Sequence, residues 1–369
     1  MNHTLSFIGR TQVRFRGRKL VYFSGCDYFR LARNRAVLRA AAAGVKRFGM
    51  GVSASRTTTG NHAVYEHLEA GLARFFGAES ALLVSAGYLG PLVAAQALAG
   101  DFSHVLMDEK AHAALRDAAR FFNCPEMVFK HRDAADFARS VRRCGPGSRP
   151  VALTNGMFPS DGSVAPIGEY LKCLPPDATL LLDDAHGAGV LGKSGRGTLE
   201  HEGAPRRQVI QCITLSKAFG AGGGAVLGTR ELRQAIVERS RAFIGSTPPA
   251  LPLACAALEA LHILRNVRRF HDRLWDNTNY IKNELRRAEI EFADNPGPII
   301  ALPPKDKGTT ASIGRALLAA GVYPSFIRYP GGPAEGCFRF VISSEHTRGK
   351  MRALNRALMG SARTAKSGG

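Results

Sequence analysis

The sequence predicts an α/β protein with a mostly parallel central sheet and a smaller α+β domain towards the C-terminus. Short apolar segments and helical segments alternate from about residue 80 to residue 230. Several apolar segments lack a polar face, as expected of strands that helices cover on both sides. A mostly helical run from Pro248 to about Glu289 then leads into a portion with mixed helix and strand signals. The expected divisions are an N-terminal arm and helix at 1–48, a large domain at 49–255 and a small domain at 256–369.

The first 76 residues show patterns typical of a strand pair, two helices and a loop between the helices. Alternation in TQVRFRGRKLVYF indicates a pair of strands joined by a turn. An Ala-rich helix is expected from about Asn34 to Phe48, with Leu38 and Val45 on one face. The segment 49–61 is rich in small residues, which indicates a loop that can approach a ligand closely. Tyr65–Phe76 is amphipathic and predicts the next helix.

Short apolar segments predict the strands of the central sheet and of the small domain. Helices are expected behind the first two strands, one ending at Gln96 and one from His112 to Phe121. The tail Ser361–Gly369 is small and polar, and we expect it to be disordered. The expected strands are 81–84, 104–107, 128–130, 151–154, 179–182, 209–215 and 225–228 in the large domain, and 298–301 and 337–342 in the small one.

The composition is that of a globular protein with a strong basic charge. The chain has 369 residues, is 45% apolar and carries a net charge of +20. Arginine is spread along the chain, which favours a general compositional bias. The alternative is an anionic partner: coenzyme A, an acidic acyl-carrier protein or nucleic acid. No nucleic-acid motif is present, so an acyl-carrier protein is the second interpretation and nucleic acid is not expected.

The cysteines and the apolar segments indicate the compartment. The seven cysteines are scattered and form no CxxC motif, which argues against a disulfide framework and against a metal site. The N-terminus has no apolar signal region, and no segment approaches the length of a membrane span. We therefore expect a cytoplasmic protein without a membrane span or a metal.

Two segments carry the chemistry: LLLDDAHGAG at 180–189 and ITLSKAFGAGGG at 213–224. Each predicts a strand, and the polar residues follow where the apolar run ends. Pyridoxal 5′-phosphate (PLP) needs a lysine for its Schiff base and a carboxylate for its ring nitrogen. Asp183, His186 and Lys217 together therefore suit a PLP enzyme. Alone, Asp183 would more often cap a turn, and His186 would equally often be an ordinary loop residue.

Small and hydroxyl residues nearby suit the cofactor's phosphate. Lys217 follows an apolar strand, where a buried lysine is usually paired or functional. Thr214 and Ser216 flank it with hydroxyl groups. The turn SAGYLG at 85–90 lies between a strand and a helix, where backbone N–H groups can bind phosphate. Tyr88 in this turn is expected to contribute packing rather than chemistry through its side chain.

The segments DDAHGAGVLGKSGRG and TLSKAFG closely resemble those of the α-oxoamine synthases. This PLP-dependent group includes 8-amino-7-oxononanoate synthase, 2-amino-3-ketobutyrate CoA ligase, 5-aminolevulinate synthase and serine palmitoyltransferase. The resemblance runs from about Tyr22 to Thr347. It implies the fold type I architecture, which is the aspartate aminotransferase-like fold, and a homodimer with its active site at the subunit interface.

The resemblance also implies a role for each matching residue of the cofactor site. Lys217 would form the Schiff base and Asp183 would bind the pyridinium nitrogen. His186 would bond the phenolic oxygen, and His112, in MDEKAHAAL, would stack on the ring. Further implied ligands are those of the phosphate: Thr214, the Gly87–Tyr88 backbone and, from the neighbouring subunit, Ser246 or Thr247.

The substrate side is implied by a single arginine. Arg339, in CFRFVISSEH, matches the arginine that holds the amino-acid carboxylate, a task suited to its bidentate geometry, although an isolated arginine could equally lie on the surface of a strand. The implied reaction joins an amino acid to an acyl thioester and gives an α-amino ketone, usually with loss of CO2. Lys217 would remove the α-proton.

Four positions depart from the family pattern, and all of them surround the substrates or cofactor. Cys26 stands where the family has Asn, Tyr65 where it has His, Asn155 where it has Glu and Pro159 where it has Ser. A diverged aminotransferase on the same scaffold is therefore an alternative. A catalytically reduced partner subunit is another, although the retained Lys217 argues against it.

Overall fold

The computed structural model describes residues 4–328 and 332–366, and for residues 361–366 it describes only the backbone. The chain divides into two compact units. Unit 1 holds the residues up to Arg33, Pro159–Ser163 and the residues from Val267 on, and unit 2 holds Asn34–Phe158 and Val164–Asn266. The divisions at residues 33 and 266 lie near the domain limits expected at 48 and 255, which stay a prediction.

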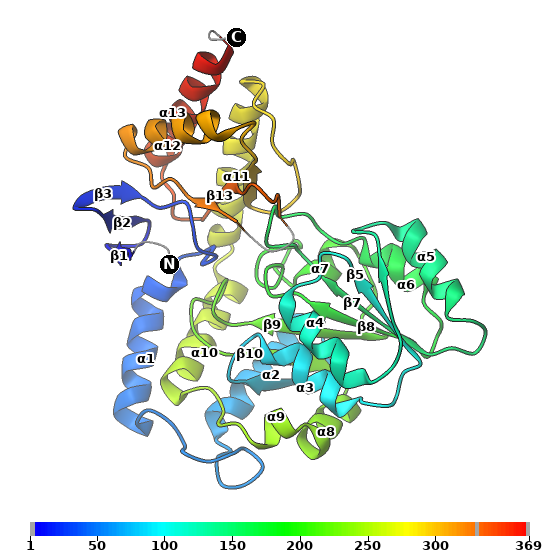
Figure 1. Ribbon diagram of the computed structural model, residues 1–369. Coiled ribbons are helices and arrows are strands. Elements are labelled where there is room, and N and C mark those ends of the chain that lie inside the picture. Colours follow the sequence, from blue (N-terminus) through cyan, green and yellow to red (C-terminus); the bar gives the residue numbers. More distant parts are fainter. Residues whose placement is uncertain (1–3, 329–331, 367–369) are drawn as a thin grey trace. The chain divides into compact units, whose positions relative to one another are not determined.

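The described part of unit 2 is built on a seven-stranded sheet in the order β4-β10-β9-β8-β7-β5-β6 (Figure 1). Strands β5 to β9 are parallel, and β10 runs antiparallel to both β4 and β9. The mostly parallel sheet and all seven of its predicted strands are thus confirmed. The strands are β4 (Ser80–Val84), β5 (His104–Asp108), β6 (Glu126–Phe129), β7 (Pro150–Asn155), β8 (Thr179–Asp183), β9 (Val209–Thr214) and β10 (Gly224–Gly228).

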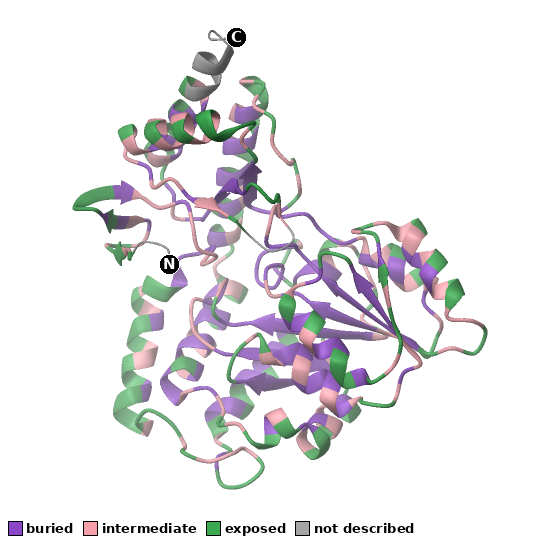
Figure 2. Ribbon diagram, in the orientation of Figure 1, coloured by how far each residue is buried: buried purple, intermediate pink, exposed green. Residues whose placement is uncertain are grey.

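Alternate residues of these strands enter two different cores, because successive side chains of a strand point to opposite faces. Leu181 packs in one core and Leu180 and Leu182 in the other. Both cores are buried (Figure 2), and this explains why the strands carry apolar side chains on both faces. The first core is covered by α3 (Leu89–Ala97), α4 (Ala113–Ala119), η2 (Arg120–Phe122), α8 (Arg230–Arg239) and α9 (Arg241–Ile244). The second is covered by α5 (Ala134–Arg143), α6 (Ile167–Cys173) and α7 (Thr198–His201).

Helix α1 (Arg35–Phe48) packs against α10 (Leu251–Asn266), which also contacts α2 (Ala63–Phe76). The contact uses Gly44, where an added Cβ would lie 3.1 Å from the Pro252 Cα. The face with Leu38 and Val45 is not the one that packs on α10: Leu38 is 51% exposed and Val45 44% exposed. A small residue lets two helices approach closely, so the packed face is not the one with the largest apolar side chains.

Unit 1 contains two three-stranded sheets among its described residues. The predicted strand pair of the arm is present as β2 (Gln12–Phe15) and β3 (Arg18–Val21), with β1 (Ser6–Phe7) beside β2. The second sheet has the order β11-β13-β12, with β11 (Ile299–Leu302), β12 (Phe326–Ile327) and β13 (Cys337–Val341). The other elements of this unit are η1 (Leu31–Arg33), α11 (Arg269–Arg287), α12 (Lys307–Ala319) and α13 (Arg348–Lys366).

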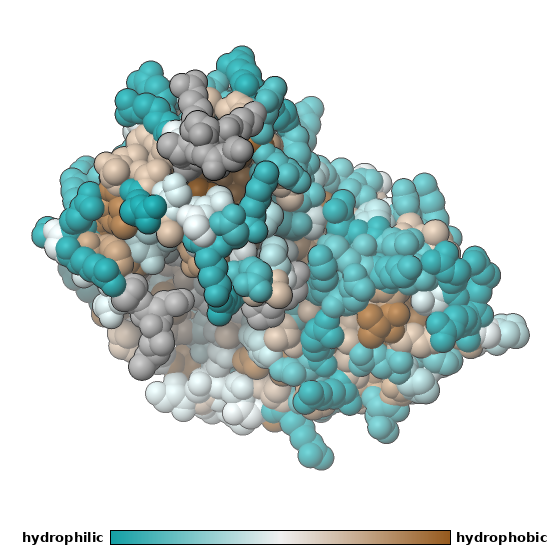
Figure 3. Space-filling view, turned by 45° about the horizontal axis from the view of Figure 1, so that its top comes forward, coloured by the Kyte–Doolittle hydropathy of each residue, from teal (hydrophilic) through white to brown (hydrophobic). Residues whose placement is uncertain are grey.

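The expected disorder of the tail is wrong for residues 361–366, which continue α13. Residues 367–369 lie outside the described residues. The surface drawn in Figure 3 is largely hydrophilic, with small apolar patches. In the described part of the chain, no helix combines the length and apolarity that a membrane span requires.

Candidate active site

Three neighbouring parallel strands end in polar residues at one edge of the unit 2 sheet. Asn155 ends β7, Asp183 ends β8 and Thr214 ends β9. Asn155 and Asp183 are paired in register. By the alternation of the strands, all three side chains share the face covered by α3 and α4. Carboxyl ends of parallel strands are the usual place for ligands in such sheets.

His112 is held beside Asp183 by the start of α4. Its backbone N–H donates to Asn155 Oδ1 at 2.8 Å, and its ring Nδ1 accepts from the Ala114 N–H at 3.3 Å. The ring nitrogen lies 3.8 Å from Asp183 Oδ2. Asp183 is itself 7% exposed and accepts the Ala185 N–H. The structure therefore brings a carboxylate and a partly exposed imidazole together, as the site requires.

The adjacent Asp184 points the other way and serves the fold. It is fully buried and accepts both the backbone N–H and the hydroxyl of Thr198 and the amide of Gln211. Burial raises the pKa of Asp184 from 3.8 to about 6. A Cβ at Gly187 or Gly197 would lie within 2.1 Å of its oxygens, so only glycine fits there.

The turn before α3 lies against the end of β9 and forms a cradle. A Cβ added at Gly87 would lie 2.6 Å from the Thr214 Cβ, so the backbone approaches the threonine closely. The Thr214 hydroxyl contacts that of Ser216 at 2.8 Å. Backbone N–H groups at the helix start, with these hydroxyls, fit a phosphate group. Tyr88 donates its phenol to Asp117 and lies edge-on to the His112 ring.

Lys217 follows β9 by three residues and is half-buried, less enclosed than the sequence predicted. His186 is buried in the loop after β8. Ser246 and Thr247 line a small hollow together with Ser85, at the turn before α3. The structure thus places these predicted residues of unit 2 around the carboxyl edge or the adjoining turn.

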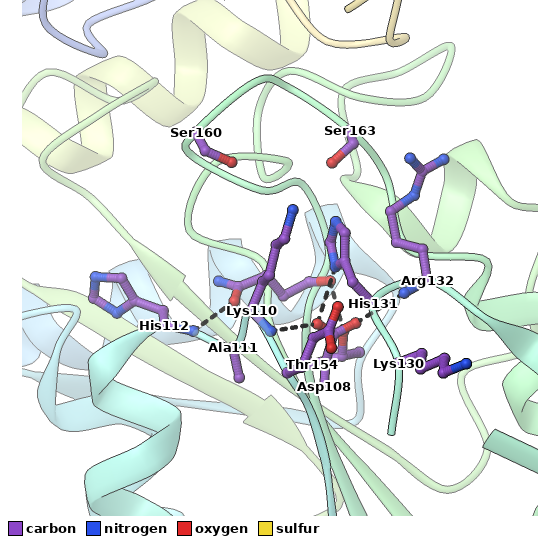
Figure 4. A network of polar contacts seen from close by, with 12 residues as sticks. Asp108, Lys110, Ala111, His112, Lys130, His131, Arg132, Thr154, Ser160 and Ser163 are labelled. Atoms are coloured by element: carbon purple, nitrogen blue, oxygen red, sulfur yellow. Dashed lines mark hydrogen bonds and ion pairs between the residues drawn. The ribbon is translucent and has the colours of Figure 1, made fainter. Parts of the chain in front are cut away.

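A buried carboxylate that the sequence did not point to fixes the loop carrying His112 (Figure 4). Asp108 is fully buried and accepts the N–H groups of Lys110 and Arg132. Its Oδ1 also lies 3.0 Å from His131 Nδ1. Since His131 is distant in the sequence, no local pattern could have revealed this pairing.

Arg339 belongs to β13 in unit 1 and is buried. Its Nε donates to the Pro159 carbonyl at 2.6 Å, and its Nη2 lies 3.5 Å from Cys26 Sγ. Two of the four departures from the family pattern therefore contact this one arginine. The third, Asn155, contacts His112 as described above.

The fourth departure, Tyr65, lies within unit 2 on α2. Its hydroxyl donates to the Pro249 carbonyl at 2.7 Å, and the Arg56 guanidinium lies over its ring. Burial raises the pKa of the Tyr65 phenol. Tyr65 thus ties α2 to the segment before α10, which carries Ser246 and Thr247 at its start.

Comparison with known proteins places the chain in a family. Residues 19–358 match the family model described as aminotransferase class I and II. The 8-amino-7-oxononanoate synthase of Thermosipho melanesiensis is 31% identical, over 90% of this chain and 85% of that protein. 8-amino-7-oxononanoate synthase 1 of Bacillus subtilis is also 31% identical, over 90% and 86%.

Solved structures share the fold. The serine palmitoyltransferase of Sphingomonas wittichii has a TM-score of 0.90 at 23% identity, covering 97% of this chain and 91% of that one. The 8-amino-7-oxononanoate synthase of Francisella tularensis has a TM-score of 0.80 at 22% identity, covering 94% and 99%.

The chain therefore belongs to the aminotransferase class I and II family, with the fold type I architecture. Within that family it is a PLP-dependent transferase of the α-oxoamine synthase group, as the segments around Asp183 and Lys217 predicted.

Proposed function

We propose that this enzyme joins an amino acid to an acyl thioester and releases an α-amino ketone and the free thiol, usually with loss of CO2. The observation that carries the proposal is the group at the carboxyl edge of unit 2, where the His112 ring lies 3.8 Å from the Asp183 carboxylate. Lys217 follows the neighbouring strand. An amine, an acid and an imidazole at one edge of the sheet suit PLP.

The residues of unit 2 would hold the cofactor as follows. The Asp183 carboxylate would accept the N–H of the pyridine ring, and His112 would pack against the ring face. His186 would bond the phenolic oxygen. Thr214 and the Gly87–Tyr88 backbone would bind the phosphate, with Ser246 or Thr247 supplied by a second subunit. When bound, PLP supplies a cationic ring that accepts electrons from the α-carbon of the amino acid.

Lys217 and Arg339 would act on the amino acid itself. The amine of Lys217 would hold PLP and then take the α-proton of the substrate, a task that needs an amine close to the cofactor. Arg339 would bind the carboxylate, since a guanidinium pairs with it through two parallel N–H donors.

Two surface features support the proposed assembly and the proposed kind of acyl donor. Leu38 and Val45 on α1 are exposed, and a homodimer would cover them. The exposed turn of the β2–β3 hairpin carries Arg16, Arg18 and Lys19. These charges favour an acyl donor with an anionic carrier, either coenzyme A or an acidic acyl-carrier protein. A cytoplasmic location stays part of the proposal.

The test is a screen of amino acids against acyl-CoA and acyl-carrier thioesters, with free thiol and CO2 measured. We expect thiol release only when amino acid, thioester and PLP are all present. Oxo-acid formation without thiol release would instead identify an aminotransferase. No reaction, with PLP bound, across the whole screen would favour a partner subunit.

A further inference from the structure

Lys282 is a buried lysine of unit 1 whose ammonium group bonds to a loop. It lies on α11 and is 4% exposed. Its Nζ donates to the carbonyl of Asn295 and, at 3.1 Å, to that of Gly297. The Asp294 carboxylate lies 4.0 Å away. Burying a lysine is costly unless its charge is compensated, so these bonds fix the loop on the helix.

The same loop holds the short segment Pro159–Ser163. The Gly297 N–H donates to the Gly162 carbonyl at 3.0 Å, and the Asn295 side chain donates to the Asp161 carbonyl at 3.4 Å. Gly162 has φ +77, and a Cβ there would lie 3.1 Å from the Ile299 side chain. The segment therefore packs closely against the start of β11.

The segment then positions Arg339 through its first residue. The Pro159 carbonyl accepts the Arg339 Nε at 2.6 Å. Since proline has no N–H of its own to donate, this carbonyl is the hydrogen-bonding group of the Pro159 backbone. Each link from Lys282 to Arg339 is a hydrogen bond or a short stretch of backbone within unit 1.

We propose that Lys282 is a positioning residue for the substrate carboxylate: through the loop at 294–297 and the segment Pro159–Ser163 it sets the orientation of the Arg339 guanidinium. This inference rests on the proposed role of Arg339. Lys282 need not touch the substrate. Its effect is exerted by fixing the carbonyl to which Nε is bonded, which leaves the plane of the guanidinium in one orientation.

The test compares Lys282→Met with Arg286→Met in the PLP-loaded enzyme. Met keeps the length and the apolar stem of the lysine in a buried site. Arg286 lies one turn further along α11 and pairs with the same Asp294, and its other hydrogen bond goes to the Asn283 side chain rather than to a loop carbonyl. We expect Lys282→Met to raise the KM for the amino acid about tenfold, because a misplacement of a binding group by about 1 Å can cost up to about 10²-fold and the effect here is indirect. The kcat, PLP binding and the KM for the thioester should change less than threefold, and Arg286→Met should leave all four within twofold.

Two further variants test the positioning role of Lys282 and the carboxylate role of Arg339 separately. If Lys282→Met does not fold, Asn295→Ala removes one bond of the same loop and should raise the amino-acid KM by a smaller factor. Arg339→Lys tests the role of the arginine separately. A raised KM in Arg339→Lys with an unchanged KM in a folded Lys282→Met or Asn295→Ala would overturn the positioning role alone. An unchanged KM in Arg339→Lys would overturn the proposed carboxylate site, and the positioning role with it. If the double variant of Lys282 and Arg339 raises the amino-acid KM no more than Arg339→Lys alone does, the two residues act on the carboxylate through the same contact.

Discussion

The carboxyl edge of the unit 2 sheet, where β7, β8 and β9 end, is called the cofactor edge below. It differs from the surroundings of Arg339 in unit 1 in how closely its residues follow the family pattern. At the cofactor edge, Asp183, His112 and Thr214 match the family pattern, whereas Asn155, which accepts the His112 backbone N–H, departs from it. Around Arg339, the guanidinium contacts Cys26 and Pro159, and both of these residues depart from that pattern. We infer that this chain keeps the residues proposed to hold the cofactor ring, and that most of its departures lie where the proposed carboxylate ligand Arg339 is held.

The largest effect is expected at Lys217. Lys217→Ala should lower turnover by roughly 10³-fold or more, since it removes the proposed proton acceptor. Steady-state thiol release measures this, with circular dichroism as the control for folding. Turnover within tenfold of wild type would show that Lys217 is not the proton acceptor, and the cofactor edge would then not keep the family chemistry.

Asp183→Asn should lower turnover by roughly 10²-fold. The neutral amide would no longer favour a protonated ring nitrogen, whereas PLP would still bind through its phosphate and Lys217. Measuring kcat and the PLP dissociation constant together separates the two effects. A variant with normal kcat would contradict the role of Asp183.

Arg339→Lys should raise the amino-acid KM by about 10- to 100-fold, because lysine cannot reproduce two parallel N–H donors. The KM of the thioester should stay within twofold. Equal changes in both constants would show that Arg339 acts on the fold rather than on the carboxylate. The surroundings of Arg339 would then not be a substrate site.

Asp184→Asn should destabilise the fold by about 2 kcal/mol at pH 5 while leaving the cofactor edge intact, since the amide would present donors to Thr198 and Gln211. The pKa of Asp184 is raised to about 6, so its contribution is present at low pH and lost as the pH rises from about 4 to 6. The gap in unfolding free energy between wild type and variant should therefore narrow from pH 4 to pH 7. A gap that widens would contradict the raised pKa.

The smallest effect is expected from Cys26→Asn, which restores the family residue beside Arg339. Both side chains can contact the guanidinium, so the amino-acid KM should change by about threefold or less. A larger change confined to one amino acid in a substrate panel would identify Cys26 as a residue that determines which amino acid is bound.

Much of the fold and of the cofactor edge could be predicted from the sequence. The seven sheet strands follow from their apolar runs, and Asp183 and Lys217 follow from the ends of those runs. Helix α1 shows where such prediction fails: its packing is decided by the close approach of Gly44 to α10, which no local pattern reports.

The features that the sequence does not predict are contacts between residues far apart in the chain. Asp108 and His131, or Lys282 and Gly297, meet only because the chain folds back, so neither pair leaves a periodic signal. The sequence alone distinguishes the role of Asp183 from that of Asp184 only in part. Alternation puts them on opposite faces of the sheet, but only the structure shows the buried partners of Asp184.

The most direct test of the account is the site at which the enzyme holds PLP. Borohydride reduction of the PLP-loaded enzyme fixes the bond between the cofactor and its lysine, and peptide mass mapping then locates it. We predict one modified peptide, containing Lys217, which disappears in Lys217→Ala. Modification of another lysine, or none in the loaded wild type, would contradict the assignment of the active site to this edge of the sheet.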